Sequence, residues 1–404
     1  MGTDYFRLHP WIGILSNLPV VAGVAAMLLL LLPLFRRRLA EQPVAWIGAL
    51  FVVTRLVFLG LVVGTMGHVS LDLTTYFEAQ GRAVLSGALP YRDFACSYAP
   101  LFPYLMAPAV MTPWPTLAIF VTFIAFDLAT VVAVAKGADD RDQAMRAAWL
   151  YTAAPISWYF LVRYGQDEAL AAALLAWAAV LLRNGGGRSA GFVLGLGFAL
   201  TKFTFGLAMP PFALAARSRR QLALGLGPPI LIVFGVALLA GLPVWRPLFG
   251  ESVELGFGPS LWRLPVLFTP LVLGRWAGLV LLLGLAVAWW WCAKLPKPRR
   301  LVPGLVVTGC VFLLLSPKVL PMYLTPFGPA VAWWLAGRAD RGDLMLVGLL
   351  NLLLGTWWYV DAGGVQGMFG PLVQALAVAV TAAVPVLLAL LIARVVRTEP
   401  RETA

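Results

Sequence analysis

Long apolar runs recur along the whole chain and are separated by short segments that carry most of the charge. A helix needs about 20 mostly apolar residues to cross the hydrocarbon core of a bilayer. The pattern therefore predicts an all-α polytopic integral membrane protein with about 13 transmembrane helices. The predicted spans are 18–35, 44–66, 115–136, 143–161, 166–183, 189–201, 203–216, 221–241, 273–293, 301–316, 320–337, 343–360 and 370–393.

Two of these predicted spans are too short to cross a bilayer alone. The runs 189–201 and 203–216 meet at Lys202, a charged residue inside an otherwise apolar stretch. We expect a broken or tilted helix pair there, which is tolerated only where protein or a cavity covers the backbone.

Two segments between predicted spans are long, 67–114 and 242–272. In the first, Leu71–Leu85 has apolar residues at helical spacing with charged residues between them, which is typical of a helix at the membrane interface. Leu101–Met111 is apolar but only about half the length of a span. Prolines interrupt it, so we predict a re-entrant or interfacial piece.

Composition supports a single transmembrane domain over residues 1–404. Hydrophobic residues make up 61% of the chain and charged residues 12%, whereas soluble domains are near one quarter charged. The net charge of +12 indicates basic cytoplasmic loops rather than nucleic-acid binding. The three cysteines form no CxxC pattern, so neither a metal site nor a disulfide framework is expected.

The distribution of basic residues predicts the orientation. If the loop with Arg36, Arg37 and Arg38 is cytoplasmic, alternation of the spans places most of the 30 Lys and Arg residues on that side. The N-terminus is then outside and the C-terminus inside. The abundance of Ala, Leu, Gly and Arg favours a bacterial inner membrane. Segments 67–114 and 242–272 become outer loops, the first being the candidate catalytic loop.

Polar residues gather on the predicted outer side. Asp72, Gly87–Pro100, Arg163–Asp167, Lys202 and Ser316–Tyr323 come from five separate segments. Charged groups at membrane depth are costly and usually serve a function. Their convergence on one face predicts a site for a polar headgroup.

These residues resemble a known family. The stretch Asp72–Pro100 contains an early acid, then Gly-x-x-Pro-Tyr-Arg-Asp-Phe and Tyr-x-Pro. Tyr164–Asp167, Lys202 and Ser316–Lys318 with Tyr323 follow in the same order as in that family. Together they resemble the GT-C glycosyltransferases that depend on polyprenol-phosphate-mannose. These include bacterial mannosyltransferases that extend phosphatidylinositol mannosides and, more distantly, the enzymes that mannosylate GPI anchors.

The resemblance implies a GT-C fold and an inverting transfer on the extracytoplasmic face. A sugar, foremost mannose, would move from a polyprenyl-phosphate donor to a lipid or glycan acceptor. A carboxylate must accept the proton of the attacking hydroxyl. Cations must stabilise the departing phosphate. The expected partners are the donor, the acceptor and membrane lipids, with no nucleic acid.

Asp72 is the expected catalytic base, with Glu78 and Asp93 as alternatives. Four cations are candidates for the phosphate, although each could instead reach toward lipid headgroups. Gln166 and Asp167 could bind sugar hydroxyls, although Asp167 could also simply begin a helix. The tyrosines could stack on the sugar or belong to the aromatic belt. The predicted substrate-binding residues are Lys318, Lys202, Arg163, Arg92, Asp93, Tyr91, Gln166, Asp167 and Tyr323.

No cofactor or metal is expected. Many GT-C relatives carry a pair of acids, but Ser70-Leu71-Asp72 has no second acid beside Asp72. A lone carboxylate suits a metal-independent base better than a divalent-cation site.

Two alternatives remain open. A transporter or lipid flippase would explain broken helices and buried charge, but it predicts two related halves, which the sequence does not show. The same fold could also use glucose, arabinofuranose or aminoarabinose. Away from the predicted site, Arg55 and Asp127 lie inside predicted spans. They could pair with each other or with a helix neighbour.

Overall fold

The protein is nearly all helical in the parts that the computed structural model describes, namely residues 10–66, 72–247, 258–263, 274–338, 340–361 and 371–399. These parts contain no β-strand, and an isolated bridge joins Pro90 and Phe94. The second predicted outer loop, 242–272, lies largely outside the described residues.

Short 3₁₀ and π-helical segments lie between several of the α-helices in the described parts of the chain. The first half contains α2 (Pro10–Leu28), η1 (Leu29–Leu31), α3 (Pro33–Glu41), α4 (Pro43–Phe51), η2 (Val52–Val57), α5 (Phe58–Met66), η3 (Asp72–Glu78), α6 (Ala79–Leu85), α7 (Phe102–Val110), α8 (Pro115–Lys136), α9 (Arg141–Ala153), α10 (Pro155–Tyr164) and α11 (Glu168–Arg183). The second half contains α12 (Gly187–Leu200), η4 (Phe203–Ala208), α13 (Met209–Ala215), α14 (Arg219–Leu239), α17 (Gly274–Ala293), η5 (Lys297–Arg299), α18 (Leu301–Leu315), η6 (Pro321–Phe327), α19 (Gly328–Arg338), α20 (Arg341–Asp361) and α21 (Pro371–Thr398).

Several of these helices have the length and composition of membrane spans. They are Pro43–Gly64, Pro115–Lys136, Arg219–Leu239, Trp276–Ala293 and Val378–Thr398, and the bent pair Asn17–Leu31 and Pro33–Glu41 passes the same test together. A polytopic membrane protein is thereby supported. All 13 predicted spans fall on mainly helical segments, but their number as membrane crossings stays a prediction.

Prolines break two segments that the sequence pattern predicts as continuous spans, and a third predicted span begins as a 3₁₀ helix. The chain bends by 93° between η1 and α3, where Leu32 is extended ahead of Pro33. Within 143–161, Ala154 is extended ahead of Pro155 and separates α9 from α10. The segment 320–337 begins as the 3₁₀ helix η6. Proline lacks an N–H and disfavours helical geometry in the preceding residue, which accounts for the first two breaks.

The predicted break at Lys202 is confirmed. The α12 helix ends at Leu200, and Thr201 and Lys202 are extended before η4 begins. The backbone carbonyls at the end of α12 need partners outside the helix. The Ala99 N–H donates to the Thr201 carbonyl at 2.8 Å, and the Leu101 N–H donates to the Ala199 carbonyl at 3.1 Å. The segment after α6 is thus fastened to the break.

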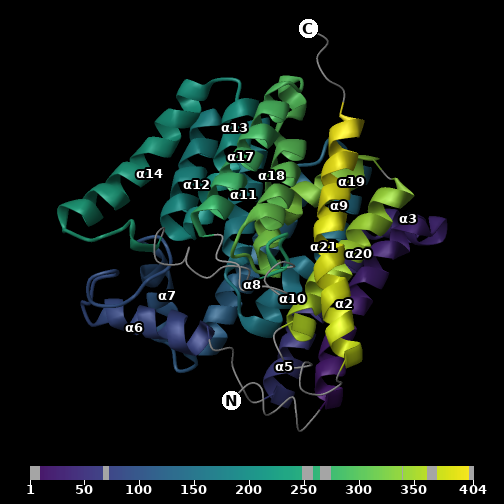
Figure 1. Ribbon diagram of the computed structural model, residues 1–404, viewed down its shortest axis with the longest axis horizontal. Helices are drawn as coiled ribbons and strands as arrows, with labels where there is room; N and C mark the ends of the chain where they lie inside the picture. Colours follow the sequence, from purple (N-terminus) through teal and green to yellow (C-terminus); the bar gives the residue numbers. More distant parts are fainter. Residues whose placement is uncertain are drawn as a thin grey trace.

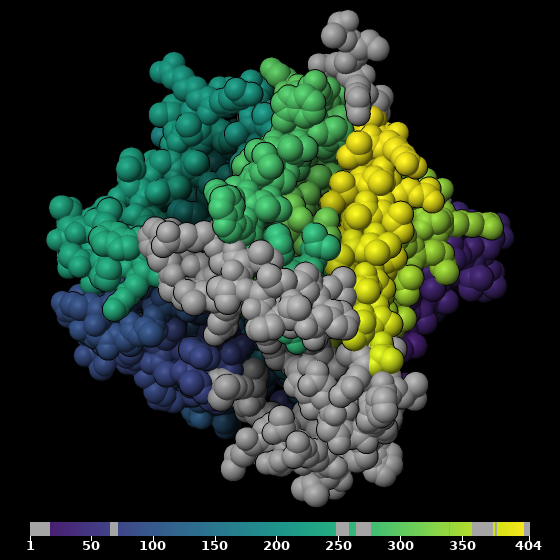
Figure 2. Space-filling model, viewed as in Figure 1, coloured from purple at the N-terminus to yellow at the C-terminus, as the bar shows by residue number. Residues whose placement is uncertain are grey.

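The long helices run side by side as a bundle, with α11 between α8 and α12 (Figure 1). The helix α6 lies across one end of this bundle, and α14 inclines away from the other helices at one edge. In the space-filling view, the blue region that includes α6 lies below the teal region of α12–α14 (Figure 2). The α7 helix has nine residues, which rise only about 14 Å, so it cannot span a bilayer.

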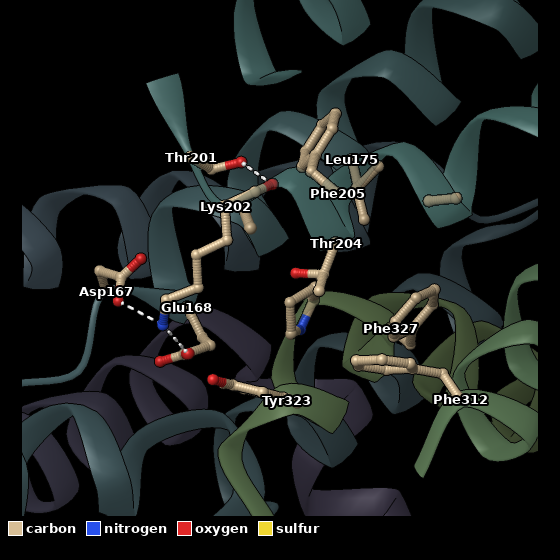
Figure 3. A pocket seen from close by; sticks show the side chains of 13 residues that line it. Asp167, Glu168, Leu175, Thr201, Lys202, Thr204, Phe205, Phe312, Tyr323 and Phe327 are labelled. Carbon is tan, nitrogen blue, oxygen red and sulfur yellow. Dashed lines mark hydrogen bonds and ion pairs between the residues drawn. The ribbon is translucent and has the colours of Figure 1, made fainter. Parts of the chain in front are cut away.

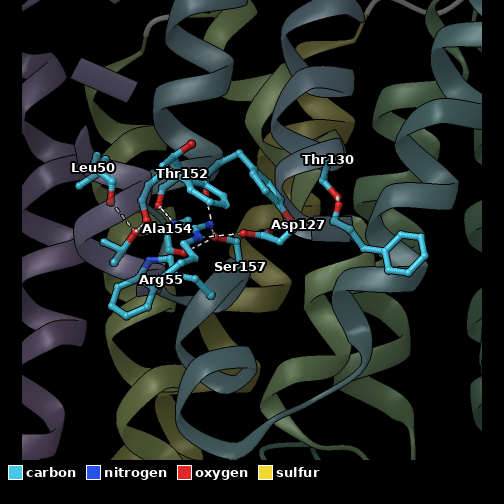
Figure 4. Close-up of polar contacts among 12 residues, drawn as sticks. Leu50, Arg55, Asp127, Thr130, Thr152, Ala154 and Ser157 are labelled. Carbon is cyan, nitrogen blue, oxygen red and sulfur yellow. Dashed lines mark hydrogen bonds and ion pairs between the residues drawn. The ribbon is translucent and has the colours of Figure 1, made fainter. Parts of the chain in front are cut away.

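Arg55 and Asp127 form a fully buried ion pair with each other, which is one of the two pairings that the sequence allows. The Arg55 Nε is 2.7 Å from the Asp127 Oδ2. The same guanidinium donates to the Thr152 carbonyl at 2.6 Å and to the Ser157 hydroxyl at 3.2 Å (Figure 4). Because Pro155 interrupts the helix here, Arg55 supplies a donor for a carbonyl beside the α9–α10 break. The pair therefore fixes the direction in which α10 leaves α9.

Candidate active site

A cavity lies where α11 meets the α12–η4 break, α18 and η6. It contains about 420 Å³ of space without atoms, part of it open to the outside. One end is polar and the rest is mainly apolar and aromatic (Figure 3). The lining residues are Asp167, Glu168, Ala171, Leu175, Thr201, Lys202, Thr204, Phe205, Ala208, Phe312, Tyr323, Pro326 and Phe327.

Lys202 is the centre of the polar end. Its ammonium lies 2.8 Å from the Asp167 Oδ1 and 2.6 Å from the Glu168 Oε1. The same nitrogen lies 5.3 Å from the ring centre of Tyr98 and 5.1 Å from that of Tyr323. Aromatic faces attract a cation at such distances. The extended backbone at the helix break is what carries this side chain to the start of α11.

Tyr98 connects this cluster to the segment that follows α6. Burial raises the pKa of Tyr98 well above its ordinary value, so the hydroxyl stays protonated. It donates to the Asp167 Oδ1 at 3.2 Å. The Tyr98 ring stacks on Phe102, with centroids 3.9 Å apart. The Tyr91 hydroxyl donates to the Tyr98 carbonyl at 2.5 Å.

Asp72, the predicted base, begins η3 and meets the same turn. The Gln166 Nε2 donates to the Asp72 Oδ2 at 2.5 Å. The next residue along the chain, Leu73, packs against Gly165, where an added Cβ would lie only 2.4 Å from the Leu73 Cδ1. Gly165 also has a φ of +64°, a conformation that favours glycine. The structure therefore brings Asp72 against the turn that carries Gln166, Asp167 and Glu168.

Asp93 and Arg92 are paired with each other and do not line the cavity. The Arg92 Nε lies 2.9 Å from the Asp93 Oδ1, and the Leu89 N–H donates to the Asp93 Oδ2 at 2.8 Å. These hydrogen bonds, first the one from Arg92, lower the pKa of Asp93 to about 2. A carboxylate with so low a pKa is a weak general base.

The stretch Pro90–Phe94 is a compact turn. The Tyr91 N–H donates to the Phe94 carbonyl at 3.0 Å, and Tyr91 has a φ of +67°. Its side chain is only 2% exposed. Its ring packs inside the protein, and a contact of Tyr91 with the sugar stays a prediction. Its hydroxyl holds the backbone of Tyr98.

The remaining predicted residues lie outside the cavity wall. Arg163 lies over the ring of Tyr164, with 5.1 Å from its guanidinium carbon to the ring centre. Its Nε is buried and has no hydrogen-bond partner among the described residues. Lys318 is half-buried, and its carbonyl accepts from the Ser316 hydroxyl at 2.7 Å. Phosphate binding by Arg163, Lys318 or Arg92 stays a prediction.

Residues 97–317 match the sequence model of glycosyltransferase family 87, which covers more than half of the chain. The chain belongs to glycosyltransferase family 87. No curated protein matches it significantly. The match includes Tyr98, Glu168 and Lys202 of the site. Asp72 and Tyr323 lie outside the matched range.

Glu168 of this family 87 chain is the site residue that sequence reasoning missed. It begins α11, lines the cavity and is 4% exposed. Its Oε2 is buried and has no hydrogen-bond partner in the described part of the chain. Two adjacent acids at the start of an apolar helix were a usable signal, because buried acids need a cationic partner.

The described residues contain no group of three or more His, Cys, Asp or Glu side chains placed to hold a metal ion. The polar end of the cavity has the two acids Asp167 and Glu168, and both already contact Lys202. Metal independence of the glycosyltransferase stays a prediction that a chelator can test.

Proposed function

We propose that this family 87 glycosyltransferase transfers mannose from a polyprenyl-phosphate donor to a hydroxyl of a lipid or glycan acceptor. The reaction would invert the anomeric configuration and take place on the extracytoplasmic side of the cell (inner) membrane. Support comes from the family membership, the apolar helices, and the resemblance of the motifs between Asp72 and Tyr323 to mannose-transferring GT-C enzymes.

One observation carries the assignment of the base: Asp72 is hydrogen-bonded to Gln166, directly before the acids of the cavity. In the proposed step, Asp72 accepts the proton of the acceptor hydroxyl. The oxygen of that hydroxyl attacks the anomeric carbon. The bond from that carbon to the phosphate oxygen breaks, and the electron pair leaves with the polyprenyl phosphate. Asp72 is preferred to Asp93, because Asp93 is tied up by Arg92.

Glu168 and Asp167 are proposed to hold the sugar. The Glu168 Oε2, which has no hydrogen-bond partner among the described residues, lies in the cavity wall and can accept from a sugar hydroxyl. A site built to hydrogen-bond a hydroxyl discriminates strongly against a sugar that lacks it. Lys202 contacts both acids, so its first task is to hold them in place. Its contribution to phosphate binding depends on whether the donor displaces one of them.

Arg163 is the proposed phosphate ligand with the strongest support. Its buried Nε has no partner in the described ranges, and it lies three residues before Gln166. Lys318 would act with it from the loop between α18 and η6. The apolar wall of the cavity, with Phe205, Phe312 and Phe327, suits the first isoprene units of the donor.

A donor panel tests this proposal. The purified protein in lipid nanodiscs would receive polyprenyl-phosphate-linked mannose, glucose, arabinofuranose or aminoarabinose with glycolipid acceptors, each with and without EDTA. We expect turnover with the mannose donor, unchanged by EDTA, and lost in Glu168→Ala. Turnover only with a nucleotide-sugar donor would contradict the polyprenyl-phosphate assignment, and turnover with another polyprenyl donor would contradict mannose alone.

A further inference from the structure

The bend between α2 and α3 forms a second, separate pocket. After the 93° bend, α3 is a short amphipathic helix that runs across the bundle edge (Figure 1). Phe35 fixes it to the bundle, because its ring packs at 4.8 Å from that of Trp149 and at 5.9 Å from that of Trp46. Leu34, by contrast, is 70% exposed beside three consecutive arginines.

Two adjoining cavities lie under this elbow and share three lining residues, Leu30, Arg36 and Arg146. The larger one contains about 730 Å³ of empty space, part of it open to the outside, and is also lined by Arg37. The smaller one continues between α9, α19 and α20 along Leu150. In Figure 2 the purple of α3 meets the yellow-green of α20 at one edge of the molecule. None of these residues lines the candidate active site.

The charges in this elbow pocket are not neutralised by one another. Arg36, Arg37 and Arg146 make no ion pair with any described residue, and the Arg146 Nε is buried without a hydrogen-bond partner. The acids that face the pocket are Asp142 and Asp340, and neither forms an ion pair with these arginines in the described ranges. A buried guanidinium nitrogen without an acceptor is costly, so an anionic ligand would stabilise the pocket by supplying the missing hydrogen-bond acceptor.

We propose that the elbow pocket binds an anionic phospholipid, with its phosphate between Arg36, Arg37 and Arg146. Guanidinium groups recognise phosphate oxygens through charge-assisted, often bidentate hydrogen bonds. The pocket is amphipathic in the same sense as a phospholipid. Arg37 lines only the larger cavity, Arg36 and Arg146 line both cavities, and Leu31, Leu150 and Leu344 line only the continuation. A small inorganic anion would use the arginines but not this apolar continuation.

Native mass spectrometry of the detergent-purified protein with added phosphatidylglycerol or phosphatidylcholine tests the proposal. We expect at least one phosphatidylglycerol to be retained in preference to phosphatidylcholine. Arg36→Ala/Arg146→Ala should weaken this binding by about tenfold or more, since two charge-assisted contacts are lost. Arg37→Ala, an exposed site where misfolding is not expected, should weaken it by about threefold or more.

Arg38→Ala is the matched control. This substitution removes the same charge from the same helix. Arg38 does not line the pocket, and it pairs with Glu41 at 3.8 Å. Its phosphatidylglycerol binding should stay at the wild-type level. Equal loss in Arg38→Ala and Arg37→Ala would contradict a defined site and indicate a general basic surface. Equal retention of phosphatidylcholine, or full displacement of the lipid by millimolar inorganic phosphate, would also overturn the proposal.

Discussion

At the scale of single residues, Lys202 shows how one cation can organise the polar end of the cavity. It lies between Asp167 and Glu168 and over two aromatic rings. Two acids share one ammonium at the polar end of the cavity. Taking these groups out of water is costly, and removal of one partner leaves the others uncompensated. Lys202 is therefore a structural requirement of the acids before it is a ligand for substrate.

Replacing Lys202 with methionine tests this requirement. Lys202→Met should destabilise the protein by about 3–5 kcal/mol, because two buried acids lose their counter-ion. Thermal unfolding in nanodiscs would measure the loss as a lower Tm. The double variant Lys202→Met/Glu168→Gln removes one of the stranded charges and should recover part of the Tm. An unchanged Tm in the single variant would show that the acids do not depend on Lys202.

At the scale of elements, the turn between α10 and α11 joins Asp72, the proposed base, to the cavity. Its position depends on Gly165, on Leu73 packed against it, and on the exit direction of α10. The Arg55–Asp127 pair sets that direction from the other end of α10. The α10–α11 turn and the α9–α10 break therefore together position Asp72.

Gly165→Ala should displace Leu73 and with it Asp72. The positive φ alone costs about 1 kcal/mol, and the added methyl group cannot coexist with Leu73 at its present place. We expect kcat to fall by about tenfold or more, because small misplacements of reacting groups slow a reaction by such factors. Gly185→Ala is the matched control, because Gly185 also has a positive φ but has open space around its Cβ. Equal activity in both variants would contradict the role of the turn.

Arg55→Met should be strongly destabilising, because Asp127 remains buried without its counter-ion. The expected loss is about 3–5 kcal/mol. In Arg55→Met/Asp127→Leu both charges are gone, so a higher Tm than that of the single variant is expected in a thermal-unfolding series. A double variant that is no more stable than the single one would mean that the carbonyl of Thr152, not Asp127, is the partner that matters.

At the scale of the whole molecule, the orientation in the membrane decides where the chemistry takes place. The three native cysteines are buried, and burial raises the pKa of the Cys96 thiol to about 12. New surface cysteines can therefore be labelled against a silent background. Ser86→Cys, next to α6, should react with an impermeant maleimide from outside intact cells. Arg217→Cys should react only after permeabilisation, and the reverse pattern would invert the proposed topology.

The sequence predicts much of the helical architecture because long apolar runs and isolated charges are strong signals. The break at Lys202 and the pairing of Arg55 with Asp127 follow from the cost of charge in an apolar run. Hydropathy does not predict the bends at Pro33 and Pro155, because the loss of one backbone N–H leaves the apolar pattern unchanged.

The site is only partly predictable. Asp72, Gln166, Asp167, Lys202 and Tyr323 come from the sequence pattern, and the structure brings them to adjoining positions. The contact between Glu168 and Lys202 and the inward packing of Tyr91 do not, because both depend on contacts between separate segments of the chain. Periodicity and motif spacing give no information about such contacts.

The central claim is that Asp72 is the base of a glycosyl transfer, and an isosteric exchange tests it most directly. Asp72→Asn would be compared with wild type and with Asp93→Asn, in lipid nanodiscs with polyprenyl-phosphate-mannose and a glycolipid acceptor. We predict that kcat falls by about 100-fold or more in folded Asp72→Asn, the usual contribution of a general base. Asp93→Asn should stay within about twofold of wild type, because Asp93 stabilises a turn and its pKa is too low for base catalysis. Near wild-type turnover by Asp72→Asn would contradict the account.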